Sequence, residues 1–345
     1  MSTVKCRCLR FYEYGNPIEV IKYENIDVST VVDSNQVLVR WLASPIHPSD
    51  INLIENVYWK KRKVPAFVQS ECVGSVEKIG ANVKHLEIGD HVLCLDTDDG
   101  ICVELSVVDQ SKLYKFDKRV DLLTKATFMA NPPTAWMMLK NYVNLVPGDY
   151  ILQNSANSGV GRSVIELAKA WGIKTINIVR NRPEINELKA ELIKLGANFV
   201  FTEEEFKSEG RKFIQSLDRP LLLSFNGVGG RSALQVSSAL AYGGTMVTYG
   251  GMSKQPHQVT TSSLVFNGIN IVGVAMGATL MQPKNAGIRT KIFDELQQLC
   301  IEGKLHAPAL DVHTMDNYKE AYRRTMEGKK RKQLILISNE NKTKL

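Results

Sequence analysis

The chain has 345 residues, of which 44% are hydrophobic and 23% are charged. This length suits two domains, each able to bury a core, and no apolar run reaches the ~20 residues that a membrane helix needs. The formal net charge of +7 is compatible with an acidic substrate or partner, but no aromatic-studded basic strand supports nucleic-acid binding. The six cysteines are scattered, so buried thiols in a reducing compartment are favoured over a disulfide framework or a metal clip.

The first 120 residues predict short strands separated by turns, a pattern typical of a partly closed β-barrel. We expect these strands at Cys6–Tyr12, Gln36–Ala43, Cys72–Gly80 and His91–Leu95. Between the second and third strands, Ser49 or Asp50 is a candidate N-cap for a short helix at Ile51–Ile54.

The pattern changes near residue 121, where two helices are predicted at Leu122–Met129 and Asn131–Asn144. Strands and helices then alternate, which predicts a doubly wound parallel sheet with a last strand at Ile269–Val272. The alternating strands are expected at 150–154, 174–179, 198–202, 221–225 and 244–249, and the helices at 162–171, 184–195, 203–217 and 231–240.

The last ~70 residues are too few for a comfortable core of their own. They predict helices at 287–302 and 316–326 and a terminal strand at Gln333–Ile337, which we expect to pack back onto the first domain. The expected domains are therefore 1–125 with 274–345, and 126–273.

The stretch from Tyr150 to Arg182 predicts a strand, a glycine turn, a helix and a second strand. Gly159 and Gly161 would let the backbone approach a pyrophosphate, and the following helix would offer its free N–H groups to the phosphates. The third glycine of G-x-G-x-x-G is absent. The glycines alone would also suit a helix-opening loop of any α/β protein.

The second strand of this stretch ends at two arginines. Arg180 and Arg182 flank Asn181 where a Rossmann fold reads the adenosine ribose, and no carboxylate follows until Glu184. Because arginine favours a 2′-phosphate and an acidic residue favours a free 2′-hydroxyl, the sequence predicts NADP rather than NAD.

Five segments carry a family resemblance that extends over nearly the whole chain: Ser44–Ile54 with Tyr58, Asn154–Gly161, Thr175–Pro183, Leu195–Ala197 with Thr202–Glu205, and Gly243–Pro256. They resemble the mitochondrial 2-enoyl thioester reductases of fatty-acid synthesis, a branch of the medium-chain dehydrogenase/reductase superfamily. The resemblance implies a GroES-like, partly open β-barrel domain joined to a Rossmann domain. It also implies NADPH-dependent reduction of the C2=C3 double bond of trans-2-enoyl thioesters, with hydride to C3 and a proton to C2.

For a chain that resembles that superfamily, the first question is whether its residues could bind zinc. Gln69-Ser70-Glu71 stands where the zinc-binding Gly-His-Glu would lie, and the four-cysteine lobe of a structural zinc is absent. His47 lies near the first zinc cysteine of alcohol dehydrogenases, but one candidate ligand makes no site. The sequence therefore predicts a zinc-free reductase.

Without a metal, a side chain must donate a hydrogen bond to the enolate-like oxygen of the intermediate. The resembled family uses a tyrosine, and Tyr58 matches it. On composition alone, Tyr58 would be a packing or surface aromatic.

The resemblance also implies a cofactor site. Asn131 matches the nicotinamide-side asparagine, although a helix cap would explain it too. Lys332 matches a lysine near the cofactor, although it also ends the solvated run Lys329–Lys332. The expected cofactor residues are Asn131, Asn157, Ser158, Gly159, Val160, Gly161, Arg180, Asn181, Arg182, Tyr249, Gly250, Gly251, Met252, Val274, Ala275, Met276 and Lys332.

Two segments depart from the family pattern. After Ile269–Val272 the family usually has Phe-Trp lining the pocket, whereas this chain has the small residues Gly273–Thr279. Near the end of the barrel, Asp98–Cys102 stands where the family has Gly-Thr-Trp. These losses predict a wider or less ordered acyl pocket with an unchanged cofactor site.

A basic run follows Tyr58, made of Lys60, Lys61, Arg62 and Lys63. It is either a surface that receives the acidic acyl carrier protein or coenzyme A phosphates, or a solvated loop. The resemblance implies a homodimer, whereas the lack of an aromatic-studded basic strand and of a long apolar run predicts no nucleic-acid or membrane partner. The resemblance also implies a mitochondrial location, with a cytoplasmic one as the alternative, because no long Arg/Ser-rich segment precedes the strand Val4–Tyr12.

Two other functions stay open. A quinone or enone reductase of the same superfamily would keep the cofactor site without depending on Tyr58. A paralogue that binds NADPH as a sensor or scaffold would fit the lost aromatic residues.

Overall fold

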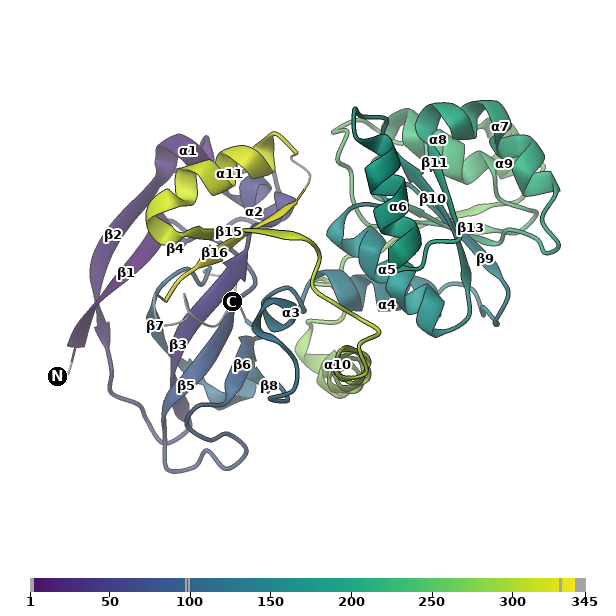
Figure 1. The fold of residues 1–345 in the computed structure, drawn as a ribbon. Helices are drawn as coiled ribbons and strands as arrows, with labels where there is room; N and C mark the ends of the chain where they lie inside the picture. Colours follow the sequence, from purple (N-terminus) through teal and green to yellow (C-terminus); the bar gives the residue numbers. More distant parts are fainter. Residues whose placement is uncertain (1–2, 97, 99, 329–330, 339–345) are drawn as a thin grey trace. The chain divides into compact units, whose positions relative to one another are not determined.

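A computed structural model describes residues 3–338 except 97, 99, 329 and 330. The chain forms two compact units, Met1–Met129 with Ala307–Leu345 and Ala130–His306, and each is described by itself. The helix and strand labels below are those of Figure 1.

The first unit is built mainly of strands, as the sequence predicts. Its strands are β1 (Thr3–Phe11), β2 (Ile21–Ser29), β3 (Gln36–Pro45), β4 (Ala66–Phe67), β5 (Val73–Ile79), β6 (His91–Cys94), β7 (Leu105–Asp109), β8 (Leu113–Lys115), β15 (Leu310–Thr314) and β16 (Lys332–Leu336). Its helices are α1 (Pro17–Val20), α2 (Pro48–Ile54), α3 (Leu122–Ala126) and α11 (Tyr318–Met326). One sheet has the order β2-β1-β4 and the other β15-β16-β3-β5-β6-β8, with β7 also paired to β3.

The C-terminal segment completes the larger sheet of this unit. β16 pairs antiparallel with β3 and parallel with β15, so residues more than 280 positions apart share one ladder. Phe11, Trp41 and Tyr322 are fully buried in the common core. Since burying each large apolar side chain contributes about 1.5–3 kcal/mol, the return of the chain stabilises the whole unit.

The cysteines of the first unit pack as small apolar side chains. Cys6 and Cys8 lie on one face of β1 and are both buried, and all six cysteines of the chain are free thiols. Burial raises the pKa of Cys8 to about 12 and that of Cys94 to about 11. These thiols are therefore protonated and unreactive, as the scattered spacing predicts.

The second unit is a doubly wound sheet. Its strands are β9 (Tyr150–Gln153), β10 (Lys174–Val179), β11 (Phe199–Thr202), β12 (Leu223–Asn226), β13 (Thr245–Thr248) and β14 (Asn270–Gly273). Its helices are α4 (Asn131–Lys140), α5 (Gly159–Ala170), α6 (Ile185–Leu195), α7 (Glu203–Gln215), α8 (Gly230–Ser238), α9 (Thr261–Val265) and α10 (Ala286–Ile301). The six strands are all parallel in the order β11-β10-β9-β12-β13-β14.

Helices cover both faces of this sheet (Figure 1). Ile165 of α5 and Leu192 of α6 pack on one face, whereas Phe206 of α7 and Val236 of α8 pack on the other. The strand order reverses between β9 and β12, which defines the Rossmann fold and places a crevice at the carboxyl ends of these two strands.

Local signals set the helix ends. Thr202 caps α7 because its side chain accepts from the backbone N–H of Glu205 at 3.1 Å, while the Glu205 carboxylate accepts from the Thr202 N–H at 2.6 Å. Gly196 follows α6 with φ +127°, a conformation that favours glycine. α4 ends at Lys140, four residues earlier than predicted.

The N-cap of α2 differs from both predicted candidates. The helix begins at Pro48 with His47 as N-cap, and the Asp50 carboxylate accepts from the His47 N–H at 2.7 Å from inside the first turn. Proline suits the first helical position because its missing N–H would have no helical partner there.

The observed units also differ from the expected domains 1–125 with 274–345, and 126–273. The first unit extends to Met129, and residues 274–306 belong to the second unit. α10 packs on α4, where the Trp136 indole donates to Glu295 at 2.9 Å. This long-range contact lacks a local sequence signal.

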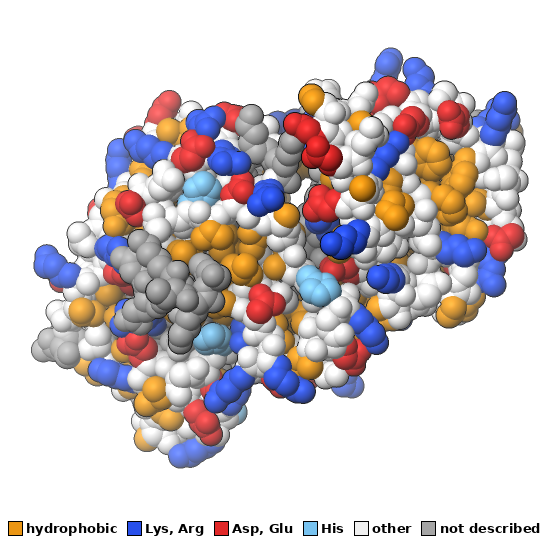
Figure 2. All heavy atoms as spheres, viewed as in Figure 1, with side chains coloured by type: hydrophobic (Ala, Val, Ile, Leu, Met, Phe, Trp, Pro, Cys, Tyr) orange, Lys and Arg blue, Asp and Glu red, His pale blue; other side chains and the backbone are white. Residues whose placement is uncertain are grey.

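No helix in the described part of the chain is long and apolar enough to cross a bilayer. On the face in Figure 2, lysine and arginine side chains are interspersed with aspartate and glutamate. Charged side chains of one sign therefore do not gather into a single patch on that face.

Candidate active site

Two asparagines join the strands at the reversal of strand order. The side-chain amide of Asn154, directly after β9, donates to Asn226 Oδ1 at 2.9 Å, and its oxygen accepts from the Gly227 N–H at 2.7 Å. Asn226, at the end of β12, donates to Thr248 Oγ1 at 3.2 Å. Both asparagines are fully buried, so this network holds the carboxyl ends of β9, β12 and β13 in register.

The glycine turn follows β9. Ser155 has φ +53°, an uncommon value for a residue with a Cβ, and Ser158 caps α5 by accepting from the Gly161 N–H at 3.1 Å. α5 begins at Gly159 rather than at the predicted residue 162, so both glycines lie inside its first turn. The free N–H groups of that turn lie at the carboxyl edge of the sheet, where an anion would bind.

Both glycines are required by close packing. A Cβ on Gly161 would lie 2.6 Å from the Ala156 carbonyl oxygen, and one on Gly159 would lie 2.4 Å from Asn131 Nδ2. The side chain of Asn131 therefore lies directly over the turn.

Two polar atoms near this turn are buried without a hydrogen bond of ordinary geometry among the described residues. They are Nδ2 of Asn131 and the hydroxyl of Tyr249, which lies close to Ser155 and Ser158. Burial raises the pKa of the Tyr249 phenol, so it stays a hydrogen-bond donor. Two unpaired buried donors beside helix N–H groups fit a phosphate-bearing cofactor.

The arginine pair follows β10. Arg180 is exposed and Arg182 is half-buried, and neither forms an ion pair with any carboxylate in the described part of the chain. Burial and the like charge of Arg180 lower the pKa of Arg182. Two neighbouring guanidinium groups without a carboxylate partner favour binding of a dianion such as a 2′-phosphate.

The remaining expected cofactor residues of this unit follow β13 and β14. The Tyr249 N–H donates to the Asn226 carbonyl at 3.0 Å and the Met252 N–H to the Gly227 carbonyl at 3.2 Å, which directs the segment Tyr249–Met252 along the loop after β12. Val274 is buried and donates to the Thr248 carbonyl at 2.9 Å, while Ala275 is exposed. Every expected cofactor residue except Asn131 and Lys332 thus follows the carboxyl end of a strand of one sheet.

Lys332 belongs to a buried polar group of the first unit. Its ammonium contacts His47 Nδ1 at 3.0 Å and donates to the Ile46 carbonyl at 3.3 Å, and His47 Nε2 lies 2.6 Å from Glu71 Oε2. Since the ammonium can only donate, His47 carries its proton on Nε2 and shares it with Glu71. Burial lowers the pKa of Lys332 to about 8, although the carboxylates of Glu71 and Asp50 raise it.

We expect Lys332→Met to change how the free energy of unfolding depends on pH. The folded protein holds the Lys332 pKa at about 8, whereas an unfolded chain has a lysine pKa of ~10.4. Between these values the unfolded state binds more protons, so rising pH stabilises the wild type relative to the variant. Urea unfolding from pH 7.5 to 10 measures this change, with Lys63→Met, an exposed lysine, as control. A difference in unfolding free energy that stays constant with pH contradicts it.

Tyr58 lies on the segment that leaves α2. The N–H groups of Val57 and Tyr58 both donate to the Asn52 carbonyl, at 2.9 and 3.2 Å, and Asn56 has φ +59°. The Tyr58 ring is half-buried against Trp59, with ring centroids 6.1 Å apart, and Trp59 is 66% exposed. The hydroxyl of Tyr58 has no hydrogen-bond partner in the described part of the first unit.

The basic run after Tyr58 is not one surface. Arg62 is only 3% exposed, so the prediction that it belongs to an exposed basic cluster is wrong. Lys60 pairs with Asp98 at 2.5 Å, while Lys61 and Lys63 are exposed. The alternation of buried and exposed side chains along 61–63 is typical of an extended segment packed on one face.

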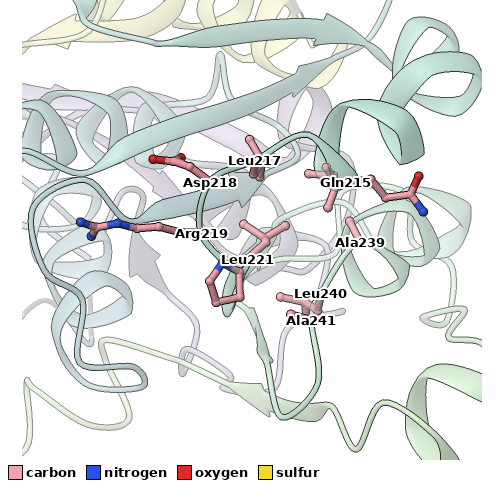
Figure 3. A pocket seen from close by; sticks show the side chains of 10 residues that line it. Gln215, Leu217, Asp218, Arg219, Leu221, Ala239, Leu240 and Ala241 are labelled. Atoms are coloured by element: carbon pink, nitrogen blue, oxygen red, sulfur yellow. The ribbon is translucent and has the colours of Figure 1, made fainter.

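A hollow of about 370 Å³ lies at the opposite edge of the Rossmann sheet (Figure 3). Leu221 and Leu240 line it, and its two charged residues are already paired: Asp218 accepts from the Tyr150 hydroxyl and Arg219 pairs with Asp149. It lies at the amino end of β12 and is not a candidate active site.

Two segments of the chain match known domain families. Residues 33–117 match the alcohol dehydrogenase GroES-like domain and residues 159–288 match the zinc-binding dehydrogenase family. The fold, together with the expected cofactor residues at the carboxyl edge of the Rossmann sheet, therefore defines the class of protein. It is a medium-chain dehydrogenase/reductase with a GroES-like and a Rossmann domain.

Relatives of known activity narrow the class. The chain is 47% identical to an enoyl-[acyl-carrier-protein] reductase, mitochondrial, from Caenorhabditis elegans, over 98% of this chain and 97% of the relative. It shares 28% identity and a TM-score of 0.89 with the Etr1p/NADP/crotonyl-CoA complex, covering 96% of this chain and 100% of that one. The mitochondrial 2-enoyl thioester reductase Etr1p/Etr2p heterodimer from Candida tropicalis matches equally well, with the same identity, TM-score and coverage. The chain belongs to the mitochondrial enoyl-[acyl-carrier-protein] reductase family.

The residues at the zinc position do not fit a metal ion, despite the description of the matching family. Ser70 replaces the expected histidine and donates to Asp50 at 2.5 Å, and the Lys332 ammonium already contacts His47. No cluster of three or more His, Cys, Asp or Glu side chains that could hold a metal occurs among the described residues. No step of the reaction is therefore assigned to zinc.

Proposed function

We infer that this protein reduces the C2=C3 double bond of trans-2-enoyl thioesters with NADPH. The observation that carries this inference is the 47% identity to an enoyl-[acyl-carrier-protein] reductase over nearly the whole chain. A cofactor edge with unpaired donors and an arginine pair supports it. The medium-chain reductase fold alone would support only a broader oxidoreductase function.

The proposed cofactor site has three parts. The N–H groups of the first turn of α5 would hold the pyrophosphate, and Arg180 and Arg182 would hold the 2′-phosphate. Asn131 and the segment Tyr249–Met252 would hold the nicotinamide side, because they contribute the unpaired donors. The part of Lys332 in this site stays a prediction, since its ammonium contacts His47 in the described structure.

The proposed chemistry assigns a donor to Tyr58. When it is bound, NADPH would supply the hydride that C3 of the substrate accepts. As C3 receives the hydride, negative charge develops on the thioester oxygen, and a phenol that donates to this oxygen stabilises the enolate. The Tyr58 hydroxyl has no hydrogen-bond partner among the described residues of the first unit, which suits this role. A proton from solvent water then adds to C2 and completes the saturated thioester.

Spectrophotometry tests this function directly. The protein is mixed with NADPH and a medium-chain trans-2-enoyl-CoA, and the loss of nicotinamide absorbance at 340 nm is followed beside a quinone control. Turnover of the enoyl thioester is expected. If quinone is reduced and the enoyl thioester is not, the protein is a quinone reductase; if NADPH binds without any turnover, it is a binding protein.

The acyl carrier protein is the proposed macromolecular partner. Lys61 and Lys63 are exposed close to Tyr58 in the sequence, so two cations remain for an acidic protein after the buried Arg62 and the paired Lys60 are excluded. Screening by salt should raise the KM for acyl-carrier substrates more than the KM for N-acetylcysteamine thioesters, which lack phosphates.

We also propose a homodimer through the edge strand β14. Apolar side chains are exposed in and beside this edge, with Tyr242 79%, Phe266 76% and Val265 64% exposed. An unpaired strand edge beside exposed apolar side chains is an expected pairing surface. A second copy of the chain would pair with the strand edge and bury these side chains.

Phe266→Glu should convert this dimer into a monomer. A buried carboxylate in an apolar interface is strongly unfavourable, and the expected loss of affinity is at least ~100-fold. Light scattering should give twice the chain mass of 38.6 kDa for the wild type and a single chain mass for the variant. Ile193→Glu, at an apolar residue of α6 that is 50% exposed, is the matched control and should stay dimeric. An unchanged mass for Phe266→Glu rules out this edge.

A mitochondrial location is proposed from the relatives, which are named as mitochondrial enzymes. Imaging of the full-length protein with a C-terminal tag against a mitochondrial marker tests it.

A further inference from the structure

Arg62 is a buried cation that the cofactor site and the proposed chemistry do not use. Its Nη2 donates to the Gln69 carbonyl at 3.0 Å and to Ser70 Oγ at 2.8 Å. Its Nε donates to the Asp98 carbonyl at 3.0 Å, and its Nη1 to the Phe67 carbonyl at 3.2 Å. A buried guanidinium is unfavourable unless its donors are satisfied, so these partners indicate a built structural position.

The contacts of Arg62 lead back to the helix before Tyr58. Ser70 Oγ, which accepts from Arg62, donates to Asp50 Oδ1 at 2.5 Å, and Asp50 lies on α2. The other carboxylate oxygen of Asp50 accepts from the N–H of His47 at 2.7 Å. Arg62 is thereby connected through one hydroxyl to the first turn of α2, and its positive charge lies close to the fully buried Asp50 carboxylate.

The segment that carries Tyr58 is consequently held at both ends. At its start, the Tyr58 N–H donates to the Asn52 carbonyl of α2 at 3.2 Å. At its end, Arg62 is inserted into the unit and its carbonyl accepts from the Tyr14 hydroxyl. Tyr58 lies at the first of these attachments, and the exposed Trp59 lies between the two.

The backbone that receives Arg62 is itself unusual. Gln69 has φ +66° and is fully buried, and neither polar atom of its side chain has a partner in the described part of the unit. A left-handed residue with a Cβ persists only where its surroundings hold it. The hydrogen bond from Arg62 to the Gln69 carbonyl supplies such a restraint, next to Ser70, which stands where the zinc-binding histidine of the superfamily would lie.

We propose that Arg62 is a positioning residue for Tyr58, an internal cation that fixes the Tyr58 segment against α2 and the Gln69–Glu71 segment in a reductase without zinc. The proposal rests on the catalytic role given to Tyr58 above. Arg62 does not contact the substrate; it limits where the Tyr58 hydroxyl can lie.

Arg62→Met tests the proposal by kinetics. Because a misplacement of ~1 Å can cost about 100-fold in rate, kcat with a medium-chain trans-2-enoyl-CoA should fall ~10–100-fold, while the Kd for NADPH stays within about twofold. Arg62→Lys keeps the charge but loses the forked geometry and should recover part of the activity. Lys319→Met, at an exposed lysine of α11 in the same unit, is the control and should behave as the wild type.

A double-mutant cycle separates positioning from general loss of fold. If Arg62 acts through Tyr58, Arg62→Met should add little to the loss already caused by Tyr58→Phe. Equal fold-losses of kcat in both backgrounds would overturn the proposal. Tyr14→Phe, which removes only the hydrogen bond to the Arg62 carbonyl, should show the same dependence on Tyr58 with a smaller loss, and it serves if Arg62→Met does not fold.

Fluorine NMR decides the proposal independently of the reaction. In protein labelled with 5-fluorotryptophan, the Trp59 resonance should shift or broaden in Arg62→Met, while that of Trp171 in the second unit stays unchanged. An unchanged Trp59 resonance overturns the proposal even if activity falls. If the Trp59 resonance shifts but activity does not depend on Tyr58, Arg62 does hold this segment in place. The catalytic role of Tyr58 is then refuted.

Discussion

Tyr58→Phe should lower kcat for enoyl thioester reduction by ~100–1,000-fold. One donor aimed at a developing oxyanion has about this effect, because the hydrogen bond strengthens as charge accumulates in the transition state. The change removes a single oxygen from a half-buried ring whose hydroxyl has no partner in the described part of the first unit, so no hydrogen bond within that part is lost. The thermal midpoint and the Kd for NADPH should therefore stay unchanged.

Steady-state kinetics with a medium-chain trans-2-enoyl-CoA measures this effect, together with NADPH titration followed by nicotinamide fluorescence. Tyr12→Phe, at a surface tyrosine of the same unit that is 49% exposed, is the control and should retain wild-type kcat. Full activity in Tyr58→Phe would remove this residue from the mechanism and favour the quinone or enone reductase hypothesis. A loss of NADPH binding in the variant would mean that Tyr58 acts in binding rather than in chemistry.

Replacing both Arg180 and Arg182 with alanine should abolish the preference for NADPH over NADH. Each charged hydrogen bond to the 2′-phosphate is worth about 1.5–3 kcal/mol, so each arginine should account for ~10–100-fold in the Kd for NADPH. NADH lacks this phosphate, and its Kd should stay within about threefold. The like charge and burial that lower the pKa of Arg182 are unfavourable in the free protein, so the double variant should not be less stable without cofactor.

Titration calorimetry with both nucleotides distinguishes the outcomes. Arg231→Ala, at an exposed arginine of α8 in the same unit, controls for the loss of one positive charge and should preserve the preference. If the double variant still binds NADPH much more tightly than NADH, another group reads the 2′-phosphate. Salt should weaken NADPH binding to the wild type more than to the double variant, because exposed cations are screened.

The fold was predictable because its signals are local. The alternation of strands and helices after residue 145 follows from side-chain periodicity, and the structure confirms the parallel doubly wound sheet. Gly196 and Thr202 mark helix ends with their own backbone and side-chain chemistry. The relatives confirm the predicted family, and the structural neighbour Etr1p is described in complex with NADP, the cofactor that the arginines after β10 of this chain indicate.

The errors share a different origin. Arg62 looks like part of a basic surface in a run of four cations, and only the carbonyls of residues 67, 69 and 98 make it a buried anchor. Similarly, His47 becomes the N-cap of α2 because Asp50 turns back to its N–H. The start of α5 at Gly159 was missed because glycine has a poor helix propensity, which close packing against Asn131 overrides.

The sequence by itself determined the class of fold, the order of the strands along the chain and the chemistry offered at each strand end, because these depend on periodicity and residue type. Only the tertiary structure decided which polar side chains have hydrogen-bond partners and which do not. It paired Lys332 with His47 and buried Arg62, and it left the donors of Asn131 and Tyr249 unpaired beside the glycine turn. The reason is physical: the free energy of a polar group depends on partners that lie tens to hundreds of residues away, and no local pattern records them.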